Sequence, residues 1–593
     1  MYTVQLIQLP LHPSTAWEPT GNIPLASALL AATAALPVES IFPEELLNTL
    51  GDTALLEELK RRDPELLGVT LYLWNRERTL HLLRSLRQWK PELLVVAGGP
   101  EVTPDNHTLL MESSIDLFVA GEGESFAADV LSPEKLRIIL ATGQKLLGPV
   151  VDTQPPDRWP DPYEKGYLAP HEGGSVHIET QRGCQCLCSY CAYRRTSPIP
   201  RMIPAETVLK KIRMLHDMGA EELVFLDPTF NSRLDMDKLL RGMSRFNLDC
   251  FAEVRSDLIH SSATADALAE AGFNSLEVGL QTMSTKVLHS VGRGGNPLSI
   301  LKGAVLLKKS GITPIMDLIL GLPGDDPGNI ELAATELVSR ELHEQVQTFC
   351  LSVLPGTELR ANAKALGIRY EDRPPYTVTQ SGPCSIQHLL QSRDRISDIL
   401  GYDADPPPRP VLSDSFPGME IFIPEKKQPL ISPSVRHGVL RIKTSDPWAY
   451  RESILGKVRE RREKDPYCPL DVVIQSEKLF PLDLIDMLND FSEPECYTTE
   501  KAKIYQVPGL LRLAVIMPPA TDLSWLMECS EMTLTVVRSH STVSLPGGQV
   551  GLLLSGSHDL AQLSALYSQA PHLVFFAQKE LEIIWNLDVL GLG

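Results

Sequence analysis

Short apolar segments alternate with amphipathic ones over the first 130 residues of the chain. The segments that predict strands are TVQLIQL, LLGVTLYLW, ELLVVAGG and IDLFVAGE, and the segment ERTLHLLRSLRQWK predicts a helix between the second and the third strand. Short buried strands that alternate with helices are typical of a parallel, doubly wound sheet. Glycines follow two strand ends, at Gly98 and Gly99 and again at Gly121 and Gly123, and ligands bind at such ends in this architecture.

A second strand–helix series begins at residue 175. Its expected strands lie in the segments SVHIETQRG, ELVFLDPTF, LDCFAEVRS, SLEVGLQ, PIMDLILGLPG and QTFCLSVLPGT. Helical segments such as AETVLKKIRMLHDMG separate them. Successive βα units of this kind predict a complete or partial (β/α) barrel of six units, whose active-site residues lie at the C-terminal ends of the strands.

Two Pro-rich segments without periodicity divide the chain. They predict a Rossmann-like domain at residues 1–150, a linker at 151–172, a barrel domain at 173–402, a second linker at 403–430 and a smaller α/β domain at 431–593. The last domain has expected strands in LDVVIQ, LLRLAVIM, MTLTVVRS and VGLLLSG. We expect it to fold independently; it either shapes the substrate entrance or serves packing or oligomerisation, and its residues favour neither role.

Composition narrows the function classes. A chain of 593 residues is too long for one hydrophobic core. The net charge of −20 disfavours binding to a nucleic-acid backbone as the main role. The N-terminal sequence has no signal-peptide pattern and the apolar runs are too short to span a bilayer, so we expect a cytoplasmic protein without membrane contact. Four of the ten cysteines lie within eight residues, which indicates metal binding.

The cysteine cluster is the most specific motif. Cys184, Cys188 and Cys191 form a C-x3-C-x2-C pattern directly after an expected strand, and three thiolates on one loop can ligate three irons of a [4Fe–4S] cube. The fourth iron then stays open and can chelate the amino and carboxylate groups of S-adenosylmethionine (SAM). A structural zinc site is the alternative, but zinc takes four ligands and the cysteines outside this loop are scattered. Cys186 is a surplus thiol that we interpret as a bystander.

The pattern, with the aromatic Tyr190 before the last cysteine, resembles the radical SAM superfamily. The resemblance implies that Tyr190 lies near the adenine of SAM. At the end of the second strand, many members carry a Gly-Gly-Glu run that contacts the SAM ammonium. This sequence has Asp227, Pro228 and Thr229 there, so Thr229 is a candidate only.

Later strand ends continue the resemblance, in order and spacing close to the coproporphyrinogen-oxidase-like branch. Glu253 ends the third strand, Gln281 the fourth, Arg293 follows twelve residues later, and Asp317 lies in the fifth. Chemically, a Glu suits an ammonium, an Arg a carboxylate and an Asp the ribose hydroxyls. The resemblance therefore implies that Glu253, Arg293 and Asp317 bind these groups of SAM, with Gln281 hydrogen-bonding nearby.

A parallel α/β domain before such a barrel resembles the cobalamin-binding subclass of the superfamily. The matching segment after the first strand is Asn22–Leu25. No D-x-H-x-x-G signature is present, so binding without a protein histidine is implied, and the loop expected below the corrin offers no histidine. The residues expected to bind cobalamin are Leu71, Tyr72, Leu73, Trp74, Asn75, Gly98, Gly99, Gly121 and Glu122.

The resemblance implies a cobalamin-dependent radical SAM enzyme, which in this subclass is most often a methyltransferase. The cluster would cleave SAM to a 5′-deoxyadenosyl radical that abstracts hydrogen from the substrate, and methylcobalamin would donate the methyl group. It further implies a small-molecule or peptide substrate and an electron donor such as flavodoxin or ferredoxin. The substrate and the catalytic residues are not identified by the sequence.

Three alternatives are weighed against this function. A non-methylating cyclase or rearrangement enzyme begins with the same hydrogen abstraction and stays open. A cobalamin or redox sensor without turnover also stays open, although the SAM-binding positions disfavour it. A methylthiotransferase needs cysteines for a second cluster in the N-terminal domain, and residues 1–183 contain none.

Overall fold

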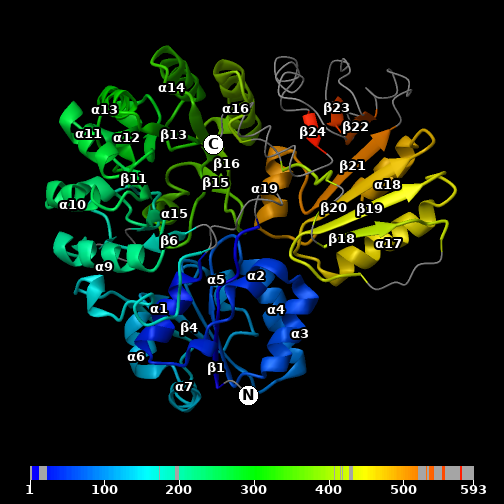
Figure 1. Ribbon diagram of the computed structural model, residues 1–593, viewed down its shortest axis with the longest axis horizontal. Coiled ribbons are helices and arrows are strands. Elements are labelled where there is room, and N and C mark those ends of the chain that lie inside the picture. The colour runs from blue at the N-terminus through cyan, green and yellow to red at the C-terminus, as the bar shows by residue number, and fades with distance from the viewer. Residues whose placement is uncertain are drawn as a thin grey trace. The chain divides into compact units, whose positions relative to one another are not determined.

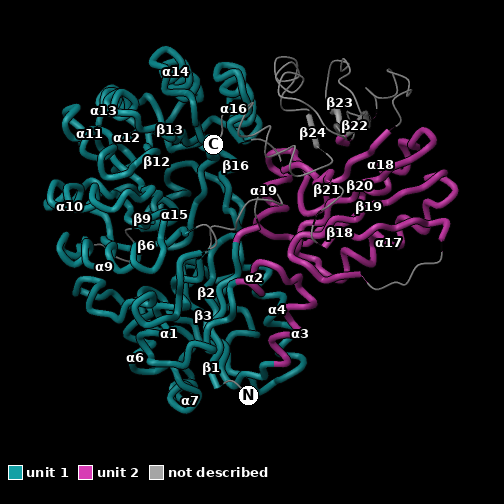
Figure 2. The backbone as a smooth tube through the Cα atoms, viewed as in Figure 1, with its two compact units in different colours: residues 1–10, 21–44, 62–406 teal, residues 11–20, 45–61, 407–593 magenta. Residues whose placement is uncertain are grey.

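The computed structural model groups the chain into two compact units (Figure 2). Unit 1 consists of Met1–Pro10, Gly21–Glu44 and Arg62–Pro406, and unit 2 consists of Leu11–Thr20, Glu45–Arg61 and Pro407–Gly593. The residues that the structure describes are 3–12, 23–171, 174–193, 200–405, 408–413, 416, 418–426, 432–517, 529, 533–539, 550–554 and 574–576.

Unit 1 begins with a five-stranded parallel sheet (Figure 1). Its strands, in spatial order, are β1 (Val4–Ile7), β2 (Leu66–Thr70), β3 (Leu94–Gly98), β4 (Leu117–Gly121) and β5 (Leu146–Val150). The first four were predicted. The sequence analysis missed β5, because Gly148 and Pro149 interrupt a short segment that lies at the sheet edge, where a strand can lack a donor.

The doubly wound character of this sheet depends on one isolated bridge. Ile41 pairs in parallel with Leu6 on the edge of β1 that faces away from β2. The chain therefore leaves β1 in one direction and returns to β2 in the other, which places a topological switch point at the C-terminal ends of β1 and β2. Helices lie on both sides of the sheet, with α1 (Leu25–Thr33) beside α6 (Glu124–Val130) and α4 (Arg76–Trp89) on the other side (Figure 1).

The second part of unit 1 is the predicted barrel of six parallel strands in sequence order. They are β6 (Ser175–Ile178), β9 (Glu222–Phe225), β10 (Asp249–Phe251) with its continuation β11 (Glu253–Val254), β12 (Ser275–Gln281), β13 (Thr313–Leu320) and β14 (Gln345–Cys350). Ala252 separates β10 from β11, but its carbonyl accepts the Glu277 amide at 3.1 Å and keeps the series continuous. Within the described ranges β6 and β14 do not pair, so the partial barrel is open on that side.

Helices and short strands connect this series. The helices are α9 (Ala205–Asp217), α10 (Met236–Met243), α11 (Ser262–Glu270), α12 (Thr285–Ser290), α13 (Pro297–Lys309), α14 (Pro327–Ser339), α15 (Glu358–Asn362) and α16 (Ile386–Leu400). A small antiparallel sheet follows, made of β15 (Ile368–Tyr370), β16 (Val378–Ser381) and β17 (Cys384–Ser385). Two further helices, α5 (His107–Leu110) and α7 (Pro133–Leu140), lie between strands of the N-terminal sheet in the sequence.

Unit 2 is built on a seven-stranded parallel sheet, in sequence order. Its strands are β18 (Met419–Phe422), β19 (Gly438–Thr444), β20 (Leu470–Ser476), β21 (Leu511–Met517), β22 (Leu534–Ser539), β23 (Val550–Leu554) and β24 (Val574–Phe576). Its helices are α17 (Arg451–Lys464), α18 (Leu482–Asn489) and α19 (Tyr497–Tyr505). Alternate residues of the central strands form one core with these helices, including Leu440, Val472, Ile474 and Leu484. Strand β18 lies inside the segment that the sequence analysis treated as a linker.

Unit 2 also contains α2 (Glu44–Thr49) and most of α3 (Asp52–Arg62), which come from the N-terminal part of the chain. The buried Asp52 accepts hydrogen bonds from the Tyr467 amide at 2.8 Å and the Cys468 thiol at 3.5 Å. The Thr53 amide donates to Asp465 at 3.1 Å. The C-terminal part of unit 2 is therefore hydrogen-bonded to a segment more than 400 residues away in sequence. In the described part of the chain, every helix is too short or too polar to traverse a bilayer.

Candidate functional site

The cluster loop is described at residues 183–193 and 200, and two short strands flank it. It starts after β7 (Gln181–Arg182) and ends at β8 (Arg201–Met202), which pair antiparallel. Asp227 at the end of β9 accepts the backbone amides of Thr180 at 2.7 Å and Gln181 at 2.8 Å. This buried carboxylate fixes the start of the loop to the neighbouring barrel strand.

The three predicted ligand cysteines lie on this loop at the C-terminal end of the barrel. Cys184 and Cys188 are buried, and Cys191 is half-buried. Burial raises the pKa of Cys191 to about 11, so binding of a cation is needed to hold it as a thiolate at neutral pH. In the described ranges no three His, Cys, Asp or Glu side chains converge on one point. A cube does not need such convergence, because each thiolate binds a different iron.

Cys186 contacts residues outside the loop. Arg255 Nη1 donates to its Sγ at 3.3 Å and to the Arg293 carbonyl at 2.9 Å. The hydrogen bond with Cys184, together with this guanidinium, holds the pKa of Cys186 below its usual range. The surplus thiol thus links the cluster loop to the segment that carries Arg293.

That segment approaches the cluster loop closely. The Ser189 amide donates to the Val291 carbonyl at 2.8 Å. Gly292 has a φ of +71°, and a Cβ there would lie 2.2 Å from the Leu187 carbonyl oxygen, so glycine is required. The approach brings Arg293 to the cysteines: burial raises the pKa of Cys188, and the charge of Arg293 opposes this rise.

The other predicted SAM residues gather inside the barrel around Arg293. Gln281, Arg293 and Asp317 each carry a buried polar atom (Oε1, Nε and Oδ1) without a hydrogen-bond partner among the described residues. Such atoms cost about 1–3 kcal/mol each when left unsatisfied. Gln281 also has a φ of +70°, and backbone strain of this kind clusters at binding sites. The donors and acceptors therefore fit a polar ligand.

Two further predicted residues border this group. Tyr190 is half-buried; desolvation raises the pKa of its hydroxyl, which is hydrogen-bonded to Cys188 and lies near Arg293 and Cys191. Thr229 Oγ1 lies 3.6 Å from Cys184 Sγ, so it contacts the cluster side of the site. Both side chains therefore lie near the cysteines.

Glu277 is a site residue that the sequence analysis did not assign. It lies directly across β11 and β12 from Glu253 and is hydrogen-bonded to Asp317. Burial and the charge of Glu277 raise the pKa of Glu253 to about 8, and the same two causes raise that of Asp317. Its position on the inward face of the strand, two residues before Gly279, was the available signal.

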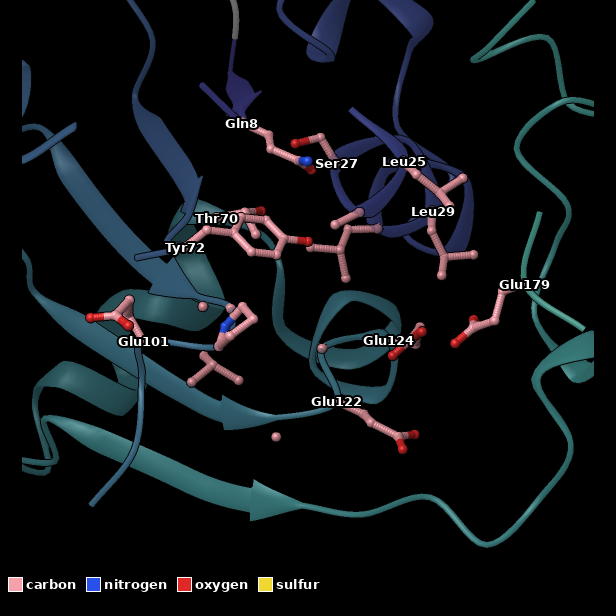
Figure 3. A pocket seen from close by; sticks show the side chains of 18 of the residues that line it. Gln8, Leu25, Ser27, Leu29, Thr70, Tyr72, Glu101, Glu122, Glu124 and Glu179 are labelled. Atoms are coloured by element: carbon pink, nitrogen blue, oxygen red, sulfur yellow. The ribbon is translucent and has the colours of Figure 1, made fainter. Parts of the chain in front are cut away.

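A cavity of about 640 Å³ lies between the N-terminal sheet and the barrel, within unit 1 (Figure 3). It opens at the switch point described above, and its wall is mainly apolar. Tyr72 projects into it, while Glu122, Glu124 and Glu179 gather on one side (Figure 3). The barrel contributes Glu179 and Tyr193, so both halves of unit 1 form the wall.

Most residues predicted to bind cobalamin line this cavity. They are Tyr72, Leu73, Trp74, Gly98, Gly99, Gly121 and Glu122. Leu71 and Asn75 do not line it. Leu71 is fully buried, and the Asn75 side chain donates to the carbonyls of Leu9 at 2.9 Å and Thr70 at 3.1 Å, which holds the loop in place. Asn22 lies outside the described residues.

Two features of the wall fit a flat, bulky ligand. The rings of Tyr72 and Trp74 stack with centroids 4.5 Å apart at an interplanar angle of 11°. Gly98 faces the cavity, and a Cβ there would meet only the Val119 carbonyl at 3.6 Å, an ordinary contact. The protein itself does not require glycine at this position, so the missing side chain leaves room for a ligand.

Several wall residues were not predicted from sequence. Gln8 directly follows β1, Ser27 lies in α1 and Glu124 begins α6. Glu179 and Tyr193 come from the segments after β6 and β7. Glu124 could have been found, because it continues the Gly-Glu-Gly motif of β4. The others carry no local pattern that separates them from ordinary surface residues.

Comparison with known proteins identifies both halves of this site. The profile of the radical SAM superfamily matches residues 178–337, which contain the cluster loop and all the predicted SAM residues. The profile of the B12 binding domain matches residues 44–131, which contain every wall residue predicted for cobalamin. The chain therefore carries a radical SAM domain and a B12-binding domain. These two domains imply a [4Fe–4S] cluster, SAM and cobalamin as cofactors.

Two named proteins are similar to more than half of this chain. "Uncharacterized methyltransferase PH0819" from Pyrococcus horikoshii is 26% identical over 361 residues, 57% of this chain and 78% of that protein. The 2-(S-pantetheinyl)-carbapenam-3-carboxylate methyltransferase of Streptantibioticus cattleyicolor is 25% identical over 385 residues, 57% of this chain and 56% of its own. The chain therefore spans only about half the length of the second relative.

Among solved structures, the cobalamin-dependent S-adenosylmethionine radical enzyme OxsB, with aqua-cobalamin and SAM bound, has a TM-score of 0.50 at 13% identity. The match covers 66% of each chain. At this identity the likeness concerns the fold alone.

Proposed function

We propose that this chain is a cobalamin-dependent radical SAM methyltransferase that acts on a small molecule. The observation that carries the proposal is the shared cavity. Tyr72 from the B12-binding domain and Glu179 and Tyr193 from the barrel line the same space, next to the loop that carries the cysteines. Two cofactors bound on opposite sides of one cavity can act on one substrate.

The residues of the chain have distinct tasks in this proposal. Cys184, Cys188 and Cys191 would hold the cluster. Arg293 would pair with the carboxylate of SAM and Asp317 with its ribose, each through a buried atom that otherwise lacks a partner. When bound, the cluster supplies the electron that cleaves SAM, and cobalamin supplies the methyl group.

The other residues near SAM bind and orient it. Glu253 would face the ammonium, and its carboxyl must lose a proton to do so, because its pKa is raised to about 8. Gln281 and Tyr190 would fix the remaining polar groups and the adenine. Thr229 borders the cysteines rather than the barrel centre.

The cavity wall excludes water and orients the second cofactor. Tyr72, Leu73 and Trp74 would lie against the corrin with no strong ligand for cobalt among them. The apolar wall keeps solvent from the reacting centre, which protects a reactive substrate radical from side reactions.

A reconstitution experiment tests the proposal. The purified chain is loaded anaerobically with iron, sulfide and cobalamin, reduced, and given SAM; we expect 5′-deoxyadenosine from the wild type and none from Cys188→Ala. Metabolite extracts are then screened for products that gain the mass of one methylene. Turnover without that gain would favour a cyclase or rearrangement enzyme, and absence of 5′-deoxyadenosine would contradict the enzyme assignment.

The proposal includes a cellular setting. An oxygen-sensitive cluster and a cobalamin that cycles through reduced states need a reducing compartment. We therefore place the protein in the cytoplasm, with flavodoxin or ferredoxin as electron donor and a small molecule as substrate.

A further inference from the structure

The two residues at the ends of the cluster loop are both arginines and are directly paired. Arg182 on β7 lies opposite Arg201 on β8 in the antiparallel register. Two like charges at paired positions destabilise a sheet unless other groups neutralise them. Two of the neutralising groups, Glu122 and Glu124, come from the B12-binding domain.

Glu122 from the loop after β4 binds both arginines. Its Oε1 forms an ion pair with Arg201 Nη2, and its Oε2 lies 3.3 Å from Arg182 Nη1. The side chains of Glu122 and Arg201 are 7% and 5% exposed. Both carboxylate oxygens of Glu122 therefore contact arginines that flank the cluster loop. Glu122 also lines the cavity of about 640 Å³.

Glu124 and Glu179 complete the arrangement around Arg182. Glu124 Oε1 accepts from Arg182 Nη1 at 2.7 Å, and the two oxygens of Glu179 accept from Nε at 2.9 Å and Nη2 at 2.7 Å. Arg182 thus joins a loop of the B12-binding domain to the end of β6 in the barrel. These three carboxylates occupy one side of the cavity (Figure 3).

We propose that Glu122 and Glu124 are positioning residues for the cluster loop, and that their ion pairs with Arg182 and Arg201 couple cobalamin binding to SAM binding. This inference rests on the proposed function for its two ligands. Removing one member of a buried ion pair leaves the other charge uncompensated, so the loop depends on these carboxylates even without any cofactor. A corrin that presses on the loop after β4 moves the same carboxylates.

The loop itself provides the first test, in the chain without cofactors. Hydrogen exchange is measured on peptides that cover residues 181–193 and 200–202. In Glu122→Gln, which keeps the shape and removes the charge, we expect exchange at least tenfold faster than in the wild type. The matched control is Glu134→Gln, an exposed residue of α7 in the same domain, which should leave exchange unchanged. Equal exchange in wild type and Glu122→Gln would overturn the positioning role.

Binding measurements provide the second test, with the cluster reconstituted. Titrations give the Kd of SAM with and without saturating cobalamin, and the Kd of cobalamin separately. Couplings between sites are typically 5- to 150-fold. We expect saturating cobalamin to tighten SAM binding by at least about fivefold in the wild type and to leave it unchanged in Glu122→Gln. A cobalamin Kd weakened more than tenfold with unchanged loop exchange would show that Glu122 binds the corrin instead.

A second variant covers the case in which Glu122→Gln does not fold. Arg182→Lys keeps the positive charge but lacks the planar guanidinium, so it loses the bidentate contact with Glu179 and the fixed geometry toward Glu122 and Glu124. In Arg182→Lys, cobalamin should no longer tighten SAM binding, while the iron content stays at the wild-type level. If cobalamin still tightened SAM binding in this variant, the proposal would be contradicted. Failure of the proposed function would appear separately, as a chain that binds no cobalamin but whose loop still responds to Glu122→Gln.

Discussion

Asp317 on β13 is hydrogen-bonded to Glu277 on β12, inside the barrel where both carboxyl groups are shielded from water. Burial and the neighbouring carboxylate raise the pKa of Asp317 well above its usual range. Glu253 faces the same group from β11, with a pKa of about 8. At neutral pH these carboxyl groups therefore hold more protons in the folded chain than in the unfolded chain.

This excess of protons makes stability depend on pH. A carboxyl whose pKa is raised on folding destabilises the folded state progressively from its unfolded pKa, about 4.3 for Glu, up to its folded pKa. The free energy of unfolding of the cofactor-free chain should thus fall between about pH 5 and pH 8. Asp317→Asn should melt a few degrees higher than wild type at pH 8, with the difference shrinking toward pH 5. Calorimetry at pH 5 and pH 8 measures the difference in melting temperature, with the exposed Asp237→Asn as control. An equal difference at the two pH values would contradict the raised pKa of Asp317.

The cluster ligands can be separated from the surplus thiol. Cys184→Ala, Cys188→Ala and Cys191→Ala should each lose most bound iron and all cleavage of SAM. Cys186→Ala should keep both, because its thiol contacts Arg255 rather than completing the C-x3-C-x2-C pattern. Iron analysis and electron paramagnetic resonance (EPR) of the reduced protein measure the cluster. Loss of the cluster in Cys186→Ala alone would show that the ligand set is wrong.

Arg293 should contribute binding energy for SAM without affecting the cluster. A charge-assisted hydrogen bond contributes roughly 1.5–3 kcal/mol, so Arg293→Ala should weaken SAM binding on the order of tenfold or more. Equilibrium binding to the reconstituted protein measures this, with iron content as the internal check. The exposed Arg245→Ala is the matched control. Unchanged affinity in Arg293→Ala would remove the carboxylate assignment.

Asp52 should stabilise unit 2, although it is encoded near the N-terminus. Asp52→Ala leaves the Tyr467 amide without its acceptor and should lower the free energy of unfolding by about 1–3 kcal/mol. Glu57→Ala removes an exposed ion pair with Lys60 and should change it by less than about 0.5 kcal/mol. Thermal unfolding compares the two variants. Equal melting temperatures would show that the C-terminal sheet does not depend on this segment.

The cobalt should lack a histidine ligand from the protein. Among the described residues that line the cavity, the one histidine is His177, on β6 of the barrel and not in the loop Leu71–Asn75. EPR of the cob(II)alamin state should show no nitrogen superhyperfine pattern from an imidazole. His177→Ala should give the same spectrum as wild type. A nitrogen pattern that disappears in His177→Ala would place the ligand in the barrel and contradict the expectation.

The local patterns of the sequence determined a large part of this protein. The cysteine spacing requires only a few consecutive residues, and the profile match to the radical SAM superfamily agrees with it. The strands β1 to β4 and the barrel strands were found because alternation and apolar runs report burial directly. Edge elements escaped the same reasoning: β5 carries Pro149, and β18 lies in a Pro-rich segment, so neither has the composition of a central strand.

Tertiary structure alone decided which distant residues meet. Ile41 makes the sheet doubly wound through a single bridge to Leu6. The hydrophobic periodicity of the sequence does not predict such a bridge. Glu122 and Arg201 are 79 residues apart, and their ion pair exists because the B12-binding sheet and the barrel bring their strand ends to one cavity. Such contacts depend on how layers pack, and packing is a property of surfaces formed only after the strands have assembled. The sequence therefore specified the chemistry of the loop, while the packing of two domains decided what holds that loop in place.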